Sequence, residues 1–296
     1  MRWRYVALPV VAVLLLASAG VAVVSWQSAG KLVHPARSAS DATPADVGLA
    51  YETARFDADA GALAGWWIPA EDARGTVVFL HGYGDTKAQA LPLASFLHHA
   101  GYHVLAFDFR AHGESEGAFT TVGLDEVRDV EAAIAHAQAR DPAAAERLAL
   151  LGFSMGAATA LNAAARSPDV DAVVADSAFA TLTNIASNSI THFTDLPPYP
   201  FGPLSVTMAG WMVGKDVAEN APVRAVATAS APVLVIQGAD DVIAFPDTDG
   251  RAIAQAAPLG SEMWLVPGAA HVQAHHVATR EYEARVLAFL EERLSD

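Results

Sequence analysis

Gly152-Phe153-Ser154-Met155-Gly156 follows a short apolar run at 148–151 and precedes a segment rich in alanine. This order predicts a buried strand, a sharp turn that carries the serine, and a helix that begins directly after the turn. The two glycines permit a close approach of strand and helix, and the strained turn exposes the serine hydroxyl. The helix directs its positive amino terminus at the same point. The stretch therefore predicts an α/β fold with a nucleophilic serine.

Short apolar runs alternate with helix-length segments along the rest of the chain from residue 49. Several runs are continuously apolar, which is typical of parallel strands covered on both faces, so we expect an α/β sheet with right-handed crossovers. The first two strands precede any helix and are expected to form an antiparallel hairpin at one edge. The expected strands are Ala50–Phe56, Leu63–Ile68, Thr76–Leu80, His103–Asp108, Leu148–Gly152, Ala172–Asp176, Val233–Gly238 and Glu262–Val266. The expected helices are Lys87–Ala100, Gly123–Arg140, Met155–Arg166, Asp247–Ala257 and Val277–Leu294.

The serine needs a general base and an acid that orients it, because a free hydroxyl is a weak nucleophile. Polar residues just beyond the carboxyl ends of later strands are the candidates, since α/β folds build their sites there. His271 follows the expected strand 262–266 and a Pro-Gly turn, which selects it as the base. Asp240 and Asp241 both follow the strand 233–238 and compete for the role of the acid.

Acyl transfer also needs two N–H donors aimed at the developing oxyanion. The residue after the nucleophile, Met155, is expected to supply one of them. The loop after the strand 76–80 is expected to supply the other, from the backbone of Tyr83. The tyrosine side chain is incidental to that role.

Five ordered motifs along residues 49–294 carry a family resemblance. They are His81-Gly82-Tyr83-Gly84, Asp108-Phe109-Arg110-Ala111-His112-Gly113-Glu114-Ser115, Gly152-Phe153-Ser154-Met155-Gly156, Gly238-Ala239-Asp240-Asp241 and Gly268-Ala269-Ala270-His271. Together they resemble the α/β-hydrolase superfamily, and more narrowly its bacterial esterase, lipase-like and aminopeptidase-like serine hydrolases. Ala111 stands where the family pattern usually has glycine.

The resemblance implies an α/β-hydrolase fold, with a mostly parallel eight-stranded sheet, helices on both faces and a small cap. It implies Asp241 as the acid, because the family acid is the third residue after the glycine of that motif. It also implies hydrolysis of carboxylic ester-type bonds through a Ser-His-Asp triad and an acyl-enzyme, without a cofactor. An aminopeptidase-like peptidase and a thioesterase or transacylase use the same machinery. A catalytically silent, membrane-anchored binding protein is the alternative outside enzymes.

The segment 179–231 interrupts the alternation of strands and helices and corresponds to the cap. It contains a proline-rich run at 197–203 between two possible helices. A segment of this length inside a compact α/β domain is usually a functional insertion. Its large apolar residues are candidates either for an acyl pocket or for packing the cap onto the domain. They are Ile190, Phe193, Tyr199, Phe201, Trp211 and Met212.

Residues 5–24 are uncharged and long enough to span a bilayer as a helix. We expect residues 1–27 to be a transmembrane anchor, with the catalytic domain outside the cytoplasm. The alternative is a signal peptide cleaved at the small residues 17–19, which would release a secreted protein. Residues 28–48 lack periodicity and are expected to be a linker to the hydrolase domain at 49–296.

Composition limits the partners. The chain has 296 residues and a formal net charge of −15, so clustered cations for nucleic acid are not expected. It contains no cysteine, which excludes a thiol nucleophile and a cysteine metal site. Neither a metal site nor a nucleotide-binding glycine pattern is expected. The expected partners are a small-molecule or lipid-like acyl substrate and the membrane, through the amino-terminal segment.

Overall fold

An eight-stranded mixed sheet forms the centre of the molecule, in a computed structural model that describes residues 3–295. The strand order is β1-β2-β4-β3-β5-β6-β7-β8, and β3 to β8 run parallel to one another. β1 and β2 form the predicted antiparallel hairpin at one edge, and β2 also pairs antiparallel with β4. The predicted α/β class is confirmed. The strands are β1 Glu52–Ala58, β2 Gly61–Ile68, β3 Gly75–Leu80, β4 Tyr102–Phe107, β5 Leu148–Phe153, β6 Ala172–Asp176, β7 Val233–Gly238 and β8 Glu262–Val266.

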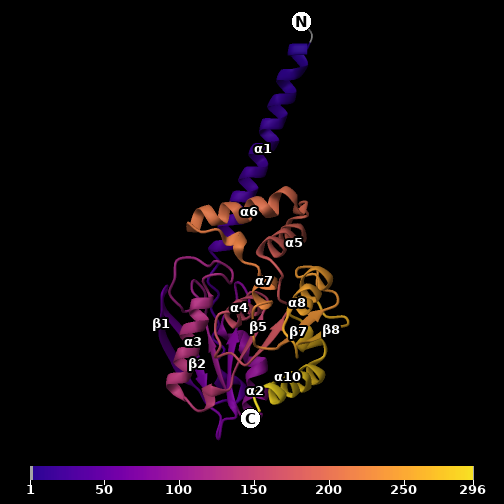
Figure 1. Cartoon of the computed structure of the whole chain (residues 1–296). Helices are drawn as coiled ribbons and strands as arrows, with labels where there is room; N and C mark the ends of the chain where they lie inside the picture. The colour runs from indigo at the N-terminus through magenta and orange to yellow at the C-terminus, as the bar shows by residue number, and fades with distance from the viewer. Residues whose placement is uncertain (1–2, 296) are drawn as a thin grey trace.

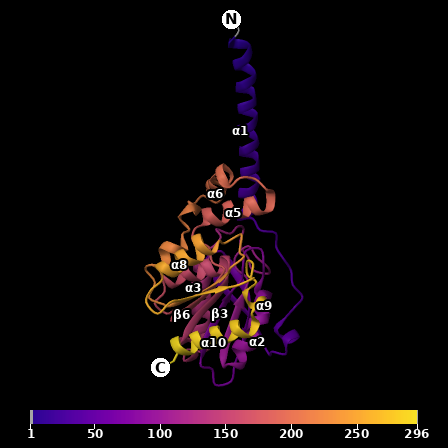
Figure 2. The same cartoon turned by 90° about the vertical axis from the view of Figure 1, so that its right-hand side faces the viewer.

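The sheet has an apolar core on each face, because side chains alternate along every strand. Val78 and Leu80 of β3 belong to one core, whereas Val77 and Phe79 belong to the other. Helices α3, α4 and α8 cover the first core, and α2 and α10 cover the second (Figures 1 and 2). Their bounds are α2 Leu91–His99, α3 Val127–Arg140, α4 Met155–Ala164, α8 Arg251–Ala256 and α10 Thr279–Arg293.

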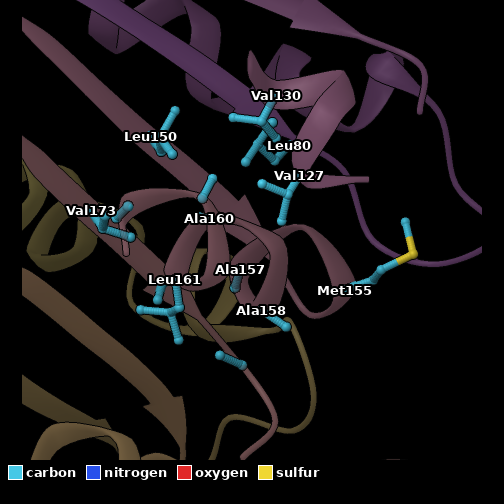
Figure 3. Close-up of a cluster of buried hydrophobic side chains, with 14 of the residues drawn as sticks. Leu80, Val127, Val130, Leu150, Met155, Ala157, Ala158, Ala160, Leu161 and Val173 are labelled. Carbon is cyan, nitrogen blue, oxygen red and sulfur yellow. The ribbon is translucent and has the colours of Figure 1, made fainter. Parts of the chain in front are cut away.

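Helix α4, which follows the serine, is buried along its whole length. Figure 3 shows its small residues Ala157 and Ala160 in the first core, with Leu150 of β5 and Val173 of β6 nearby. Small side chains let the helix lie close to the sheet, so its amino terminus is held firmly at the end of β5. The sequence prediction of this strand and helix is confirmed.

Several helices begin with tighter or wider turns than the sequence predicted. The expected helix 123–140 begins only at Val127, because Glu126 is engaged by the preceding turn. The expected helix 87–100 opens with the 3₁₀ turn η2, and the expected helix 247–257 opens with a π-helical turn, η5. The last expected helix, 277–294, begins two residues later as α10, and a separate short helix, α9, precedes it. The additional bounds are η2 Lys87–Ala90, η5 Pro246–Gly250 and α9 Ala274–Val277.

The cap consists of two helices above the sheet and two short turns that lead back to β7. Helix α5 is Leu182–Thr194 and helix α6 is Pro198–Val213, followed by η4 Val217–Glu219 and α7 Pro222–Val226. The proline-rich run was expected between two helices. It instead forms the beginning of α6. Tyr199 has extended backbone angles there, so the regular helix starts after it. Figure 1 shows α6 lying across the lower end of the first helix, α1 (Trp3–Val33), with α5 beneath it.

Helix α1 is Trp3–Val33, and it extends beyond the expected end of the anchor at residue 27. Its last turns pack against the cap: Ala29 and Val33 are buried in the same core as Val206 and Ala209 of α6. The remainder of the helix projects away from the domain (Figures 1 and 2).

The segment after α1, part of the expected linker 28–48, is attached to the domain by hydrogen bonds. Arg37 donates hydrogen bonds to the backbone carbonyls of His112, Gly113, Ser115 and Gly117, at distances from 2.5 to 3.5 Å. The segment also contains a 3₁₀ turn, η1, at Pro44–Val47. Sequence periodicity cannot reveal such attachment, because one arginine binding four carbonyls leaves no repeat in the sequence.

Candidate active site

Ser154 lies at the turn between β5 and α4 with strained backbone angles, a φ of 50° and a ψ of −110°. The turn is possible because its flanking glycines carry no side chain. A Cβ on Gly156 would lie 2.0 Å from the carbonyl oxygen of Leu80, and a Cβ on Gly152 would lie 2.4 Å from the backbone of Gly156. The N–H of Ser154 donates to the carbonyl of Asp176 at 2.9 Å, which fixes the turn against β6.

Ser154, His271 and Asp241 form a continuous chain of hydrogen bonds, although they come from the ends of three different strands. The Oγ of Ser154 is 2.9 Å from Nε2 of His271, and Nδ1 of His271 is 2.8 Å from Oδ2 of Asp241. The carboxylate can only accept, so Nδ1–H donates to it and Nε2 is left to accept from the serine hydroxyl. This is the tautomer that a general base for Ser154 requires.

Asp241 is held in place by four donors. Its Oδ1 accepts from the backbone N–H groups of Ile243 and Ala244, at 2.8 and 2.9 Å. Its Oδ2 accepts from Nε2 of Gln237 at 2.8 Å as well as from His271. Asp240, the alternative acid, is exposed. The structure therefore brings Asp241, not Asp240, to the histidine.

The loop after β3 carries Tyr83, and a buried histidine sets the orientation of its peptide group. Nε2 of His81 accepts from the N–H of Phe109 at 2.9 Å, so Nδ1–H donates to the carbonyl of Gly82 at 2.7 Å. Because the two ends of a trans peptide point in opposite directions, the N–H of Tyr83 is directed away from His81. Burial lowers the pKa of His81 to about 3, so the ring stays neutral and keeps this arrangement.

Tyr83 and Met155 line the same cavity as Ser154. Among residues 3–295, no hydrogen bond engages the backbone N–H of either residue. Both donors are thus free to bind an oxyanion. The sequence selected these two residues, but it gave no indication of the role of His81 as the group that orients the loop.

The carboxyl group of Asp176 lies beneath the site, at the end of β6. The hydroxyl of Ser177 donates to its Oδ1 at 2.9 Å and accepts from the N–H of Val272, the residue after His271, at 3.0 Å. Burial raises the pKa of Asp176 to about 7. This pair links the turn of Ser154 to the loop of His271, and the sequence does not reveal it because a polar residue at the end of a strand carries no sign of such a link.

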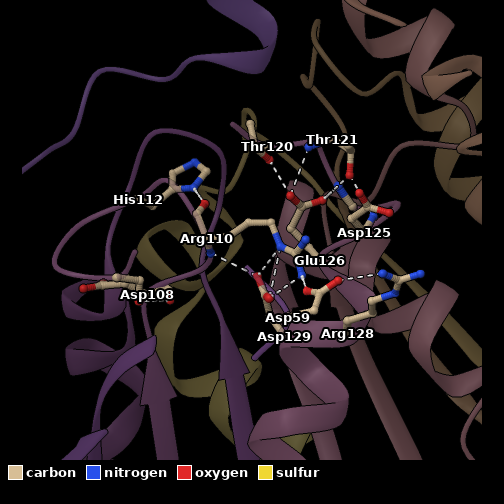
Figure 4. A network of polar contacts seen from close by, with 12 residues as sticks. Asp59, Asp108, Arg110, His112, Thr120, Thr121, Asp125, Glu126, Arg128 and Asp129 are labelled. Carbon is tan, nitrogen blue, oxygen red and sulfur yellow. Dashed lines mark hydrogen bonds and ion pairs between the residues drawn. The ribbon is translucent and has the colours of Figure 1, made fainter. Parts of the chain in front are cut away.

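The loop at 108–115 contains Ala111, where the family pattern usually has glycine. Ala111 adopts a φ of 60°, the left-handed conformation that the usual glycine would take. Arg110 fixes the loop to α3 through an ion pair with Asp129 at 2.6 Å, and it also pairs with Asp59 at 2.5 Å. Figure 4 shows this network next to His112. Alanine therefore occupies a left-handed position, and the ion pairs of Arg110 hold the loop in place.

A cavity of about 640 Å³ opens above Ser154, under the cap. Of the apolar cap residues considered from the sequence, Ile190 and Phe193 line it. Phe201 and Met212 pack within the molecule, and Tyr199 and Trp211 are exposed. Of the two alternatives that the sequence left open, lining a pocket therefore applies to two of the six residues, and packing within the molecule applies to another two.

Helix α1 contributes to the same cavity, which the sequence did not suggest. Ser28, Lys31 and Leu32 form part of the wall. The hydroxyl of Tyr83 donates to the carbonyl of Lys31, so the end of α1 is joined to the loop after β3. The spacing of these residues on one helical face is a weak signal, because any helix places residues three and four apart on one side.

Comparisons with known proteins agree with this architecture. Residues 71–197 match the family model described as serine aminopeptidase, S33. The uncharacterised protein Rv2307c of Mycobacterium tuberculosis is 30% identical over 273 residues, which cover 90% of this chain and 88% of that protein. The esterase Pf2001 of Pyrococcus furiosus superposes with a TM-score of 0.76 and 28% identity, over 90% of this chain and 99% of the esterase.

A peptidase shares the fold as well. The acylaminoacyl peptidase of Pyrococcus horikoshii superposes with a TM-score of 0.64 and 21% identity, over 84% of this chain and 42% of the peptidase. At that identity the likeness concerns the fold alone. With the sheet, the serine turn and these relatives taken together, the chain belongs to the α/β-hydrolase superfamily, as a serine hydrolase of that fold.

Proposed function

We propose that the protein is a serine esterase that cleaves carboxylic esters through Ser154, His271 and Asp241. The observation that carries the proposal is the chain of hydrogen bonds at 2.9 and 2.8 Å, which opens onto a cavity lined largely by apolar side chains. An apolar wall suits the acyl chain of an ester, whereas a peptide substrate would need polar partners for its backbone.

The reaction proceeds in two steps. His271 takes the proton of Ser154 as Oγ attacks the ester carbonyl, and Asp241 stabilises the imidazolium that forms. The N–H groups of Tyr83 and Met155 hold the oxyanion at the amino terminus of α4. The alcohol leaves with the proton from His271, and water then attacks the acyl-enzyme with His271 again as the base.

A fluorophosphonate probe and a series of p-nitrophenyl esters test the proposal. The wild-type protein should be labelled at Ser154 and should hydrolyse the esters, whereas Ser154→Ala should lose labelling and activity, by about 10³-fold or more. Ser230→Ala, at an exposed serine, is the matched control and should behave as the wild type. A folded wild-type protein that resists the probe would contradict the assignment.

An aminopeptidase is the second candidate, and one observation favours it. Asp85 lines the cavity and is an acidic group that a substrate ammonium can bind. Three other acids do not line the cavity: Glu114 pairs with Lys87, Glu116 pairs with Arg55, and Asp195 is exposed. Parallel assays with p-nitrophenyl esters and aminoacyl p-nitroanilides distinguish an esterase from an aminopeptidase. An aminopeptidase would cleave the anilides faster than the esters, and the Asp85→Asn variant would lose this activity.

We also propose that α1 anchors the protein in a membrane, with the catalytic domain outside the cytoplasm. Residues Pro9–Val33 form a helix long and apolar enough to cross a bilayer. Signal-peptide cleavage is the alternative. Extraction of membranes with alkaline carbonate and sequencing of the mature amino terminus separate the two, because an anchored protein resists extraction and retains residues 1–19.

A further inference from the structure

The cavity that contains Ser154 reaches the molecular surface between α1 and α5. Lys31 of α1 and Phe193 of α5 both line the cavity and both are exposed, which places its mouth between the two helices. Ser28 and Leu32 continue the α1 side of the wall inward. The entrance to the site is therefore built partly from the helix that has the length and composition of a membrane span.

Helix α6 presents an uncharged outer face at the same level. It lies across the base of α1, between the projecting part of α1 and the sheet (Figures 1 and 2). No charged residue occurs between Asp195 and Lys215, yet Tyr199 is 76% exposed and Trp211 is 69% exposed. A helix face that meets water normally carries charged residues. Exposed aromatic residues without charged neighbours are instead typical of the membrane–water interface.

The packing of α1 on α6 fixes this face relative to the membrane span. Ser25, Ala29 and Val33 recur every fourth residue and form one buried stripe of α1. Small residues in such a stripe let two helices approach closely. Trp26, which is 51% exposed, lies beside the stripe, where the continuous apolar run of α1 gives way to polar residues such as Gln27 and Ser28. A bilayer crossed by α1 would therefore have its surface at the level of α6.

We propose that the outer face of α6 and the mouth of the cavity are seated in the membrane interface, and that Ser154 takes a long-chain acyl ester directly from the bilayer. This inference rests on the proposed esterase function and on the proposed anchor. An acyl chain that leaves the leaflet beside Phe193 enters the cavity without passing through water, so it avoids the free-energy cost of exposing its methylene groups.

The position of α6 is tested without using activity. Because the chain contains no cysteine, Trp211→Cys gives a single site for an environment-sensitive fluorophore. In the full-length protein reconstituted into phosphatidylcholine vesicles, spin-labelled lipid should quench this label strongly. Leu259→Cys is the control, because Leu259 is 99% exposed and lies at the amino-terminal end of β8, whereas His271 and the site lie beyond the carboxyl end of that strand. Equally weak quenching at the two positions would overturn the proposal.

The route of the substrate is tested by comparing two esters in the same vesicles. Tyr199 and Trp211 lie outside the cavity, so the double variant Tyr199→Ser/Trp211→Ser should hydrolyse water-soluble p-nitrophenyl butyrate at the wild-type rate. Hydrolysis of vesicle-embedded 4-methylumbelliferyl palmitate should fall about tenfold or more, since two interfacial aromatic anchors are lost. An unchanged rate on the embedded ester, or equal losses on both esters, would overturn the proposal.

These outcomes are distinguishable from failure of the esterase assignment. If the wild-type protein hydrolyses neither ester, the proposed function fails. The claim that Ser154 takes its ester substrate from the bilayer then fails with it. The quenching experiment would still decide whether α6 is seated in the interface, because it does not depend on turnover.

Discussion

Asp241 and its neighbour Asp240 differ in their surroundings more than in their position along the chain. Four donors surround the Asp241 carboxylate, whereas the Asp240 side chain faces solvent. Asp241→Asn should lower kcat by about 10⁴-fold, because an amide stabilises the wrong tautomer of His271. Steady-state hydrolysis of p-nitrophenyl butyrate provides the measurement.

Asp240→Asn is the matched control for that substitution. It removes a charge one residue away but leaves the hydrogen bonds of His271 intact, so kcat should stay close to the wild-type value. If the two variants lost activity equally, the assignment of the acid to Asp241 would be wrong.

Asp176 predicts a pH dependence of stability. Its folded-state pKa is raised to about 7 by burial, whereas an unfolded aspartate ionises near 3.8. Between these pH values the unfolded chain releases a proton that the folded chain keeps. The contribution of Asp176 to the free energy of unfolding is therefore fully present at low pH and is lost as the pH rises from about 4 to 7. Asp176→Asn should match the wild type near pH 4 and exceed it at pH 8, by about 2 to 4 kcal/mol.

Urea unfolding at a series of pH values measures this difference. The amide oxygen of the variant can still accept from Ser177, so the link to the loop of His271 is retained. Asp240→Asn again provides a control at an exposed carboxyl group. A constant difference between Asp176→Asn and the wild type across the pH range would exclude a buried neutral carboxyl group.

At the scale of elements, the turn before α3 depends on one buried glutamate. Glu126 accepts from the hydroxyls of Thr120 and Thr121 and from the N–H groups of Thr121 and Gly123, at 2.7 to 3.0 Å (Figure 4). This turn places Val122, with a φ of 58°, in the wall of the cavity. Glu126 thereby connects the beginning of a helix to the shape of the pocket.

Glu126→Gln should lower the free energy of unfolding by about 2 kcal/mol. The NH₂ group of the glutamine amide would face hydroxyl and N–H donors that now bind a carboxylate oxygen. The substitution should also raise KM for esters more than it lowers kcat, since Val122 lines the cavity and belongs neither to the proposed triad nor to the proposed oxyanion donors. Urea unfolding and steady-state kinetics measure the two effects. Glu131→Gln, at an exposed glutamate of the same helix, should change neither. A kcat effect larger than the KM effect would place the turn closer to the chemistry than the structure does.

The elements that the sequence predicted well are those whose signal is local. Buried parallel strands are continuous apolar runs in the sequence. Because the strands are parallel, the polar residues that follow their carboxyl ends, such as His271 and Asp241, lie at the same end of the sheet. The turn around Glu126 was missed because two of its four donors are backbone N–H groups, which leave no trace in residue types, and the other two are threonine hydroxyls that form no periodic pattern. The packing of α1 against α6 was missed because an apolar helix looks the same whether lipid or protein covers it.

At the scale of the whole molecule, α1 belongs to the catalytic domain as much as to the proposed anchor. Ala29 and Val33 lie in the main core, the N–H of Thr120 donates to the carbonyl of Val33 at 2.9 Å, and Lys31 lines the cavity. A chain that lacks residues 1–24 keeps all of these contacts. A chain that lacks residues 1–35 loses them together with a wall of the pocket.

The two truncations should therefore differ sharply when both are studied in detergent micelles. The chain without residues 1–24 should keep the Tm and the p-nitrophenyl butyrate activity of the full-length protein. The chain without residues 1–35 should be less stable by about 3 kcal/mol, from the lost burial of Val33 and its neighbours. That loss corresponds to about 6 °C or more in Tm, and KM should rise because one side of the cavity is open. Equal Tm and KM in the two truncated chains would show that α1 ends functionally at the membrane surface, and that its last turns are not part of the enzyme.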